Sequence, residues 1–488
     1  MSYTSVVHCL GWSVLLLAAL MIFPALTAMF EGSTQLAWTF GASAVLSGFF
    51  GGGFALATRQ SGGNFGKREA FMFLVLVWLV LAFFGAIPLH FSGIPLHPID
   101  AYFESISGLT TTGATTFVGL EAMSPAILLW RALLQWAGGF LTIVLAVSLI
   151  AHLGVGGMGA LQSTLPRGEG GSLPARILQT TRDLLWIYLL LTLIGALALW
   201  GAGMSAFEGL CHAFSGISTG GFSTHDDGIA GFGAPLVELV LMIIMLIGAV
   251  NFTLHWAAFN GQLRVFRENI DVYYLSVTLA ILTFSFLLVS LWRGNGDDFL
   301  STFRVEIFTT ISALTTSGFS NGPIRGPTAV ATVVPPVVIV GLILAGGSFA
   351  STTGGIRLNR IAILFKQAQR ELSRLTFPHG IRVLRLGTQR VENSIIWSVW
   401  GYFFGFILAL VAIALALAFF ELEASAAIAA ATVIISNAGP LLHAIVPEAP
   451  KFVEMSEGAK ITLIIGMLAG RVELLALLSL LNPVFWNR

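Results

Sequence analysis

Long apolar runs alternate with short polar loops along the whole chain. Runs of about 20 apolar residues match the thickness of the hydrocarbon core of a bilayer. They cover residues 9–30, 35–57, 69–91, 124–152, 180–203, 232–259, 271–292, 327–350, 391–420 and 459–482. We therefore predict an all-α polytopic membrane protein. The first run has no basic flank and is longer than a signal-peptide core, so we expect it to be a retained span.

Shorter half-apolar stretches lie between some of these runs. They end near Leu109, Ile217, Leu314 and Ile435, and Ser, Thr, Asn or Gly follows each end. A stretch of about 10–14 residues is too short to cross a bilayer and is typical of a re-entrant helix.

The polar segments that follow the short stretches form an internal repeat. Aligned on their last glycine, they read SGLTTTG (Ser107–Gly113), SGISTGG (Ser215–Gly221), SALTTSG (Ser312–Gly318) and VIISNAG (Val433–Gly439). Each copy has the order span, short helix, polar turn, span. A single turn of this kind could be an ordinary loop between helices. Four copies in the same phase instead predict pseudo-symmetric membrane–pore-loop–membrane repeats around a central pore. Two additional transmembrane helices precede these repeats. The predicted units are residues 1–66 (two N-terminal helices), 67–165, 166–268, 269–385 and 386–488 (pore repeats 1 to 4).

The polar turns have the chemistry of a cation filter. Irregular backbone at membrane depth survives where it is buried in protein or lines water, and a ring of backbone carbonyls can replace the water shell of potassium. Glycine permits the backbone angles that direct successive carbonyls into one lumen, and hydroxyls can add oxygen ligands or pin the loop. The candidate filter residues are Thr110, Thr111, Thr112, Gly113, Ser218, Thr219, Gly220, Gly221, Thr315, Thr316, Ser317, Gly318, Ser436, Asn437, Ala438 and Gly439.

Composition agrees with a membrane protein and excludes other classes. Hydrophobic residues make up 56% of the 488 residues and charged residues only 10%. The 24 Lys and Arg balance the 24 Asp and Glu, so net charge gives no reason to expect a nucleic-acid partner. Cys9 and Cys211 are too few for a disulfide framework.

Most Lys and Arg residues fall in the loops on one side of the predicted spans. Because basic loops stay in the cytoplasm, we expect both termini to be cytoplasmic and all four short helices to enter from outside. The inner set is Arg59, Lys67, Arg68, Arg167, Arg176, Arg182, Arg264, Arg267, Arg357, Arg360, Lys366, Arg370, Arg374, Arg382, Arg385, Arg390 and Arg488. Outer-loop acids such as Asp100, Glu104 and Asp226 would concentrate cations, although loop acids also simply keep a surface hydrated.

Further motifs identify the chain as similar to a known family. They are QWAGG (Gln135–Gly139), NFTLHWAAF (Asn251–Phe259), GGSFASTTGG (Gly346–Gly355), RELSRL (Arg370–Leu375) and GRVE (Gly470–Glu473). With the repeated turns, they resemble the TrkH/KtrB/HKT superfamily of potassium transporters, and the two extra N-terminal spans resemble its TrkH branch. The resemblance implies potassium uptake through the bacterial inner membrane by a homodimer with one pore per subunit, gated by a cytosolic nucleotide-binding ring such as TrkA. It implies potassium as substrate and no cofactor.

The resemblance also assigns roles to single residues. Gly113, Gly221, Gly318 and Gly439 match the filter glycines of the family. A serine at the first position accompanies sodium transport in some plant relatives, so Gly113 favours potassium. The fourth copy departs from the pattern, because Asn437-Ala438 replaces the Thr-containing pair and Pro440 follows directly. Selectivity is therefore expected to be weaker than in channels with a longer carbonyl ladder.

A glycine-rich break in the third repeat is the candidate gate. Four glycines among Gly346–Gly355 make a poor helix interior, and the segment matches the intramembrane loop that blocks the passage in the family; a kinked helix is the alternative. Arg471 lies in the middle of a predicted span, where inserting a charged side chain into the bilayer costs at least about 2.5–3.5 kcal/mol of free energy. The family places an arginine here, beside the gate. The alternative is a structural salt bridge to another span. The candidate gate residues are Gly346, Gly347, Ser348, Ser351, Thr352, Thr353, Gly354, Gly355 and Arg471.

Other signals leave alternatives open or carry little weight. The basic stretch 357–390 follows the gate and suits either a partner that pulls on it or anionic lipid headgroups. Gly154–Gly159 matches GxGxxG, but it follows a span rather than a strand. His212 and His255 lack metal-ligand spacing. A sodium- or proton-coupled symporter is the alternative function; an intramembrane enzyme has little support because catalytic motifs are absent from the sequence.

Overall fold

The computed structural model describes residues 3–59, 66–150, 173–293, 299–322, 334–377, 383–386 and 389–472. The α-helices are α1 (Tyr3–Leu20), α2 (Ile22–Phe30), α3 (Thr34–Ala57), α4 (Lys67–His90), α5 (Pro98–Leu109), α6 (Pro125–Leu145), α8 (Leu173–Gly201), α9 (Ala206–Ile217), α10 (Pro235–Ala249), α11 (Phe252–Phe259), α12 (Arg264–Glu268), α13 (Ile270–Arg293), α14 (Phe299–Leu314), α16 (Pro336–Ala345), α17 (Leu358–Thr376), α18 (Asn393–Phe419), α19 (Ala424–Ile435), α20 (Leu442–Ile445) and α21 (Glu457–Arg471). Short 3-10 or π segments are η1 (Leu120–Ala122), η2 (Ala146–Ile150), η4 (Ala230–Phe232), η5 (Gly439–Leu441) and η6 (Phe452–Glu454). The strands β1 (Arg385–Leu386) and β2 (Gln389–Arg390) pair antiparallel.

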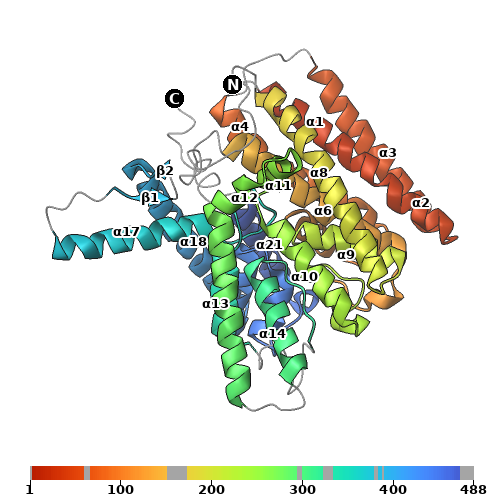
Figure 1. Cartoon of the computed structure of the whole chain (residues 1–488). Coiled ribbons are helices and arrows are strands. Elements are labelled where there is room, and N and C mark those ends of the chain that lie inside the picture. The colour runs from red at the N-terminus through yellow and green to blue at the C-terminus, as the bar shows by residue number, and fades with distance from the viewer. Residues whose placement is uncertain are drawn as a thin grey trace.

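The helices follow the repeated order that the sequence predicts. Each unit has a first long helix, a short helix that ends at a polar turn, and a second helix: α4–α5–α6, α8–α9–α10, α13–α14–α16 and α18–α19–α21. Helices α1, α2 and α3 lie at one edge of the bundle, where α1 packs on α3 and α4 (Figure 1). The chain is thus a polytopic helical membrane protein, as predicted.

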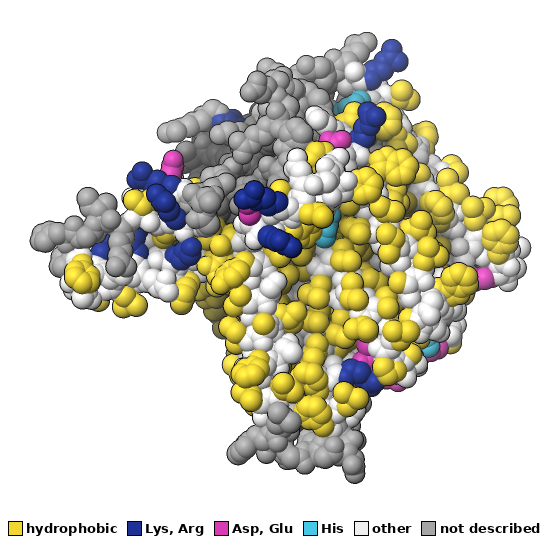
Figure 2. All heavy atoms as spheres, viewed as in Figure 1, with side chains coloured by type: hydrophobic (Ala, Val, Ile, Leu, Met, Phe, Trp, Pro, Cys, Tyr) yellow, Lys and Arg dark blue, Asp and Glu magenta, His cyan; other side chains and the backbone are white. Residues whose placement is uncertain are grey.

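The surface of the bundle is apolar enough to face lipid. Within the described ranges, seven helices are long and apolar enough to cross a membrane, or eight if a bent pair counts as one span. Hydrophobic side chains cover most of the bundle in Figure 2, and Trp38, Trp186 and Leu408 are among those left exposed. Because exposing apolar side chains to water is unfavourable, their position on the surface indicates that the bundle is surrounded by lipid hydrocarbon.

The sixth predicted span, residues 232–259, is broken rather than continuous. Helices α10 and α11 meet at an angle of 98°. The last carbonyls of α10 bond to the glycine-rich loop of the third repeat: Ala249 O accepts from Ser348 N–H at 3.1 Å, and Gly248 O accepts from Thr352 N–H at 3.2 Å. Asn251 then caps α11 by accepting from Thr253 N–H at 2.9 Å. These long-range bonds replace the helical bonds that would have continued α10.

Two other predicted spans are shorter in the described part of the chain. Residues 327–350 contain the short helix α16, which ends at Ala345 with Gly346 as its C-cap. Residues 459–482 begin as α21, and their remainder from residue 473 lies outside the described residues, as does the GxGxxG match at 154–159. Helix α17 projects away from the bundle beside α18 (Figure 1).

Candidate functional site

The four polar turns share a left-handed residue at one aligned position. Positive φ values occur at the aligned residues Thr111 (53°), Thr219 (51°), Thr316 (53°) and Asn437 (54°). Left-handed backbone costs a residue with a Cβ about 1–2 kcal/mol. Its recurrence at one aligned position, two residues before the last glycine, means that the surrounding structure imposes it.

Each short helix ends in a Schellman motif, in which two backbone N–H groups bond back to helix carbonyls. In the first repeat, Thr112 N–H donates to Ser107 O and Thr111 N–H donates to Gly108 O, both at 2.9 Å. The corresponding bonds of the later repeats are Gly220 to Ser215 and Thr219 to Gly216, Ser317 to Ser312 and Thr316 to Ala313, and Ala438 to Val433 and Asn437 to Ile434. The motif reverses the chain by using its N–H groups, so the turn carbonyls are not consumed by the helix ends.

Most of the aligned hydroxyls pin the turns to the helices. Thr110 and Thr315 each donate to a carbonyl four residues back at 2.7 Å, and Ser218 does the same at 2.8 Å. These bonds hold each turn against its helix and leave the lone pairs of the hydroxyl oxygens available. The fourth repeat differs, since Ser436 Oγ is buried and has no hydrogen-bond partner among the described residues.

The turns touch one another in a closed ring. A methyl group added at Gly113 would collide with the Gly220 carbonyl oxygen, and one added at Gly221 would collide with Ser317 O. Pro440 follows the fourth turn, and a methyl group added at Gly318 would lie only 2.7 Å from Pro440 Cδ. Gly439 N–H donates to Thr112 O at 2.7 Å, which joins the fourth turn to the first. The contacts thus run from repeat 1 to 2, 3, 4 and back to 1.

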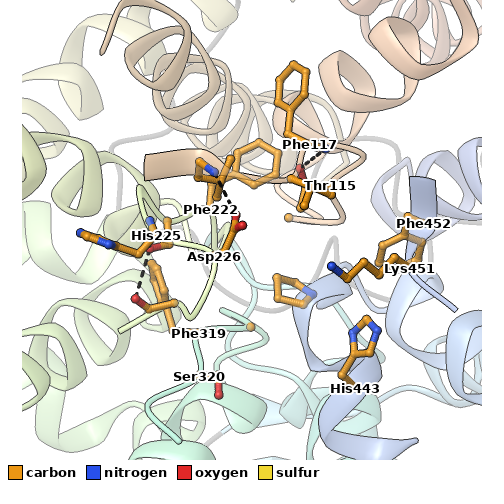
Figure 3. Close-up of a pocket in the computed structure, with 18 of the residues that line it drawn as sticks. Thr115, Phe117, Phe222, His225, Asp226, Phe319, Ser320, His443, Lys451 and Phe452 are labelled. Carbon is orange, nitrogen blue, oxygen red and sulfur yellow. Dashed lines mark hydrogen bonds between the residues drawn. The ribbon is translucent and has the colours of Figure 1, made fainter. Parts of the chain in front are cut away.

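A cavity of about 190 Å³ opens directly outside this ring (Figure 3). Its lining includes the ring residues Gly113, Gly221, Gly318 and Pro440. The remaining lining residues are Thr115, Phe117, Val118, Leu120, Arg131, Phe222, Ser223, His225, Asp226, Gly228, Phe319, Ser320, His443, Lys451, Phe452 and Val453. We call this space the outer cavity. Because all four repeats contribute to it, it lies over the point where the turns meet.

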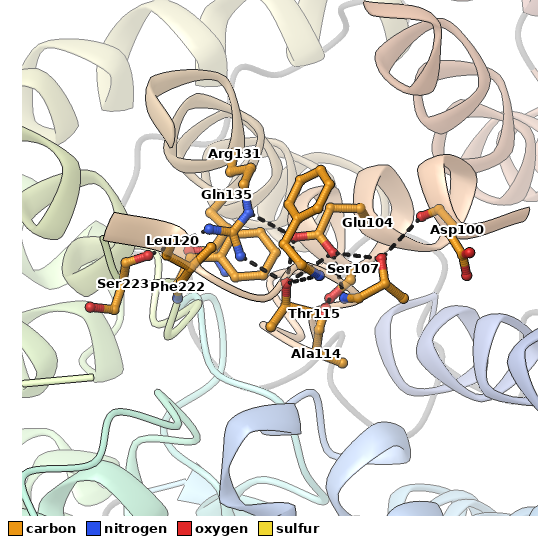
Figure 4. A network of polar contacts seen from close by, with 12 residues as sticks. Asp100, Glu104, Ser107, Ala114, Thr115, Leu120, Arg131, Gln135, Phe222 and Ser223 are labelled. Carbon is orange, nitrogen blue, oxygen red and sulfur yellow. Dashed lines mark hydrogen bonds and ion pairs between the residues drawn. The ribbon is translucent and has the colours of Figure 1, made fainter. Parts of the chain in front are cut away.

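A buried ion pair lies behind the first turn (Figure 4). Arg131 Nε donates to Glu104 Oε1 at 2.7 Å, and the side chains are 2% and 0% exposed. Glu104 also accepts from Thr116 N–H at 2.9 Å and from Thr115 Oγ1 at 2.9 Å. Arg131 reaches the second repeat, where it donates to Ser223 O at 3.4 Å. The pair therefore fixes the segment that follows Gly113 and ties it to the neighbouring repeat.

Gln135, one helical turn after Arg131 on α6, supports the second turn. Its Nε2 donates to Gly220 O at 2.8 Å, and its Oε1 accepts from Phe222 N–H at 3.2 Å. Sequence patterns alone did not reveal these contacts of Arg131 and Gln135. The available signal was a charge inside the predicted span 124–152, a position that is costly unless the charge is paired.

Charged side chains also join repeats at two other boundaries. Lys460 Nζ donates to Asp100 Oδ1 at 2.6 Å, which connects the fourth repeat to the first. Glu238 Oε2 forms an ion pair with Arg304 Nε at 3.2 Å, which connects the second repeat to the third.

On the outer side of the second repeat, Glu208 closes a capping box at the start of α9. Its carboxylate accepts from Ser205 N–H at 3.0 Å and lies 3.2 Å from His225 Nε2. Burial raises the pKa of the Glu208 carboxyl, but hydrogen bonds from Ser205 and His225 outweigh burial and hold the pKa below its ordinary value.

The glycine-rich segment Gly346–Gly355 lies under the ring as an irregular loop between α16 and α17. Thr352 Oγ1 donates to Gly248 O at 3.0 Å and lies 3.1 Å from Thr219 Oγ1 of the second turn. Gly354 N–H donates to Thr316 Oγ1 of the third turn at 2.8 Å, and Gly354 packs against Ser436 O of the fourth. The loop therefore touches three of the four turns.

Arg471 connects the same loop to the first turn. Its guanidinium donates to Thr111 Oγ1 at 2.6 Å and to Thr353 O at 3.4 Å. Among the described residues it has no ion-pair partner within 4.0 Å, and Glu473 lies outside that part of the chain. The structure thus brings the predicted gate residues and the predicted filter residues into one connected site.

The described residues contain no group of three or more His, Cys, Asp or Glu that could hold a metal ion. The oxygen atoms of the site are instead backbone carbonyls and hydroxyls, which suit a hard monovalent cation in transit.

Comparison with known proteins agrees over the whole chain. Residues 39–269 and 270–482 match the family described as "TrkH: Cation transport protein". The chain is 37% identical to the Trk system potassium uptake protein TrkH of Salmonella typhimurium over 100% of both chains, and 32% identical to TrkG of Escherichia coli K12 over 99% of this chain and 98% of the relative. The crystal structure of the potassium transporter TrkH from Vibrio parahaemolyticus superposes with a TM-score of 0.89 at 32% identity, over 100% of both chains. These relatives are named as transporters, in agreement with the prediction that the chain is not an enzyme. From its repeated turns to its full-length matches, the chain belongs to the TrkH family of cation transport proteins.

Proposed function

We propose that the chain mediates potassium uptake across a bacterial cytoplasmic membrane, with the four turns acting as a selectivity filter of backbone carbonyl oxygens. The observation that carries the proposal is the closed ring of contacts among four turns that each have a left-handed residue two positions before their last glycine. Relatives named as potassium uptake proteins support the choice of ion. A permeating cation would separate the turns and take up the carbonyl contacts, including the Thr112 oxygen that now accepts from Gly439.

The loop Gly346–Gly355 and Arg471 are proposed as the gate. The loop lies against the inner side of the ring and lacks a helical hydrogen-bond ladder, so it can move without unwinding a helix. The Arg471 charge would repel a cation that leaves the filter, until the loop moves and carries its contacts away.

A cytosolic TrkA-like ring and a second copy of the chain are the proposed partners. Helix α17 follows the loop directly, so a partner bound to α17 could displace the loop. Basic side chains gather around α12 and α17 (Figure 2), toward the end of the bundle at which α1 begins in Figure 1. This grouping supports cytoplasmic termini by the positive-inside rule.

The filter proposal is tested by Gly113→Ser. Gly113 has φ +75°, and a side chain there would collide with Gly220 O. We expect the displaced carbonyl to widen the ring and raise sodium permeation relative to potassium in reconstituted flux measurements. Gly119→Ser is the matched control, since Gly119 has φ +76° with no atom within 4 Å of the added Cβ. An unchanged sodium-to-potassium ratio in Gly113→Ser would contradict the role of Gly113.

Coupled symport is the second candidate function. The four units enter the membrane in the same sense, whereas coupled carriers commonly have inverted repeats, and this favours a channel-like pore driven by the membrane potential. Potassium flux into liposomes without any other alkali cation or a pH gradient should persist for a pore. Flux that required either gradient would establish symport.

A further inference from the structure

Of the Lys and Arg side chains that line the outer cavity, Lys451 is the one that has no ion-pair partner among the described residues. Lys451 is the N-cap of η6 in the outer loop of the fourth repeat, where its backbone N–H donates to Glu454 Oε2 at 3.0 Å, and it contributes to the lining of the cavity together with Gly113, Gly221 and Gly318. Its ammonium points toward the middle of the cavity, on the side opposite Asp226 (Figure 3). Lys451 forms no ion pair with any residue that the structure describes.

The other charges around the cavity are already engaged. Asp226 accepts from Gly119 N–H at 2.7 Å and from Leu120 N–H at 3.0 Å. Arg131 is paired with Glu104, as described above. His225 lies between Glu121 and Glu208, at 3.4 and 3.2 Å. His443, from the same repeat as Lys451, is the remaining titratable side chain of the lining. Lys451 therefore adds an uncompensated positive charge to the field that an arriving cation meets, on the side of the cavity opposite the Asp226 carboxylate.

We propose that Lys451 is an electrostatic barrier at the outer cavity that lowers the apparent affinity for potassium. This inference rests on the proposed function, because it requires that cations enter the filter through this cavity. A fixed positive charge lowers the local concentration of cations, and the protein walls of a cleft focus its field. Within the cavity a unit charge changes the local cation concentration by about three- to tenfold at low ionic strength. The effect acts on sodium and potassium alike, so selectivity stays with the turns.

The test compares the full-length Lys451→Gln and Lys451→Arg variants in cells that lack other potassium uptake systems. We expect Lys451→Gln to lower the KM for potassium by about three- to tenfold in low-salt medium. The maximal rate and the sodium-to-potassium ratio should stay unchanged. Raising ionic strength with an impermeant organic salt should remove the difference, because the Debye length falls to about 8 Å at 0.15 M.

Two controls separate this inference from other effects. Lys451→Arg keeps the charge and should keep the wild-type KM. Glu421→Gln changes an exposed outer charge that does not line the cavity and should also leave KM unchanged.

The outcomes distinguish the inference from the filter proposal. An unchanged KM in Lys451→Gln, or a change that persists at high ionic strength, overturns the barrier even if Gly113→Ser alters selectivity. If Gly113→Ser leaves selectivity unchanged, the filter proposal fails, whereas a salt-dependent KM in Lys451→Gln still identifies the cavity as the entrance.

Discussion

Glu104→Gln is expected to destabilise the protein and to loosen the first turn. The substitution keeps the size of the side chain but removes the charge that compensates the buried Arg131 guanidinium. Breaking a buried ion pair by removing one partner costs about 3–5 kcal/mol, because the remaining charge stays buried without compensation. The glutamine amide would also present N–H donors where Glu104 now accepts from Thr116 N–H and Thr115 Oγ1. We therefore expect Glu104→Gln to lower the free energy of unfolding by an amount in the upper part of this range.

The double variant Glu104→Gln/Arg131→Met separates the ion pair from the packing around it. Removing both charges relieves the uncompensated guanidinium, and apolar replacement of a buried pair is often neutral. The double variant should therefore be more stable than Glu104→Gln alone. The destabilisation of the double variant should be smaller, by about 2 kcal/mol or more, than the sum for the single variants Glu104→Gln and Arg131→Met. The assay is the fraction of purified protein in detergent that stays folded after heating, together with the sodium-to-potassium flux ratio.

A matched control for this experiment is Glu421→Gln, which removes an exposed carboxylate and should change stability by less than about 1 kcal/mol. The reasoning is refuted if Glu104→Gln is as stable as this control, or if the double variant loses as much as the two single variants added together. Because Thr115 and Thr116 follow Gly113 directly, an increase in the sodium-to-potassium ratio of Glu104→Gln would extend the effect to the filter.

Two further predictions concern the gate and the outer side. Shortening the loop Gly346–Gly355 should raise potassium flux without altering selectivity, and Thr352→Val, which loses the hydroxyl bond to Gly248 O, should raise flux more weakly. Thr462→Val is the control, because the Thr462 hydroxyl bonds within its own helix. Flux equal to that of the control would argue against the gate. The lowered pKa of Glu208 means that its contribution to stability is complete above its ordinary value of 4.5 and is lost as pH falls through the lower folded value. Glu208→Gln should therefore lower stability at neutral pH and flatten its decline in acid, as measured by thermal melting across pH; a decline as steep as that of the wild type would contradict this assignment.

The sequence by itself determined the class of the protein and the positions of its four turns. Both depend on local properties of the chain. An apolar run of about 20 residues has the length of a helix that crosses the hydrocarbon core of a bilayer, and the turn residues stand directly after a short helix. The aligned positive φ values at Thr111, Thr219, Thr316 and Asn437 agree with the alignment made from sequence. The helix-terminating break at Gly346 was likewise visible, because glycine-rich segments are poor helices.

Only the tertiary structure decided which groups meet across the repeats. The bend between α10 and α11 depends on Ser348 and Thr352, which lie about a hundred residues further along the chain. The pairing of Glu104 with Arg131 and the direction of Lys451 into the outer cavity likewise depend on how distant helices pack. Hydrophobic periodicity records which residues avoid water, and it carries no information about which buried polar groups find each other. Those partnerships arise from packing, because a buried charge or carbonyl is stable only where the folded chain brings it a partner.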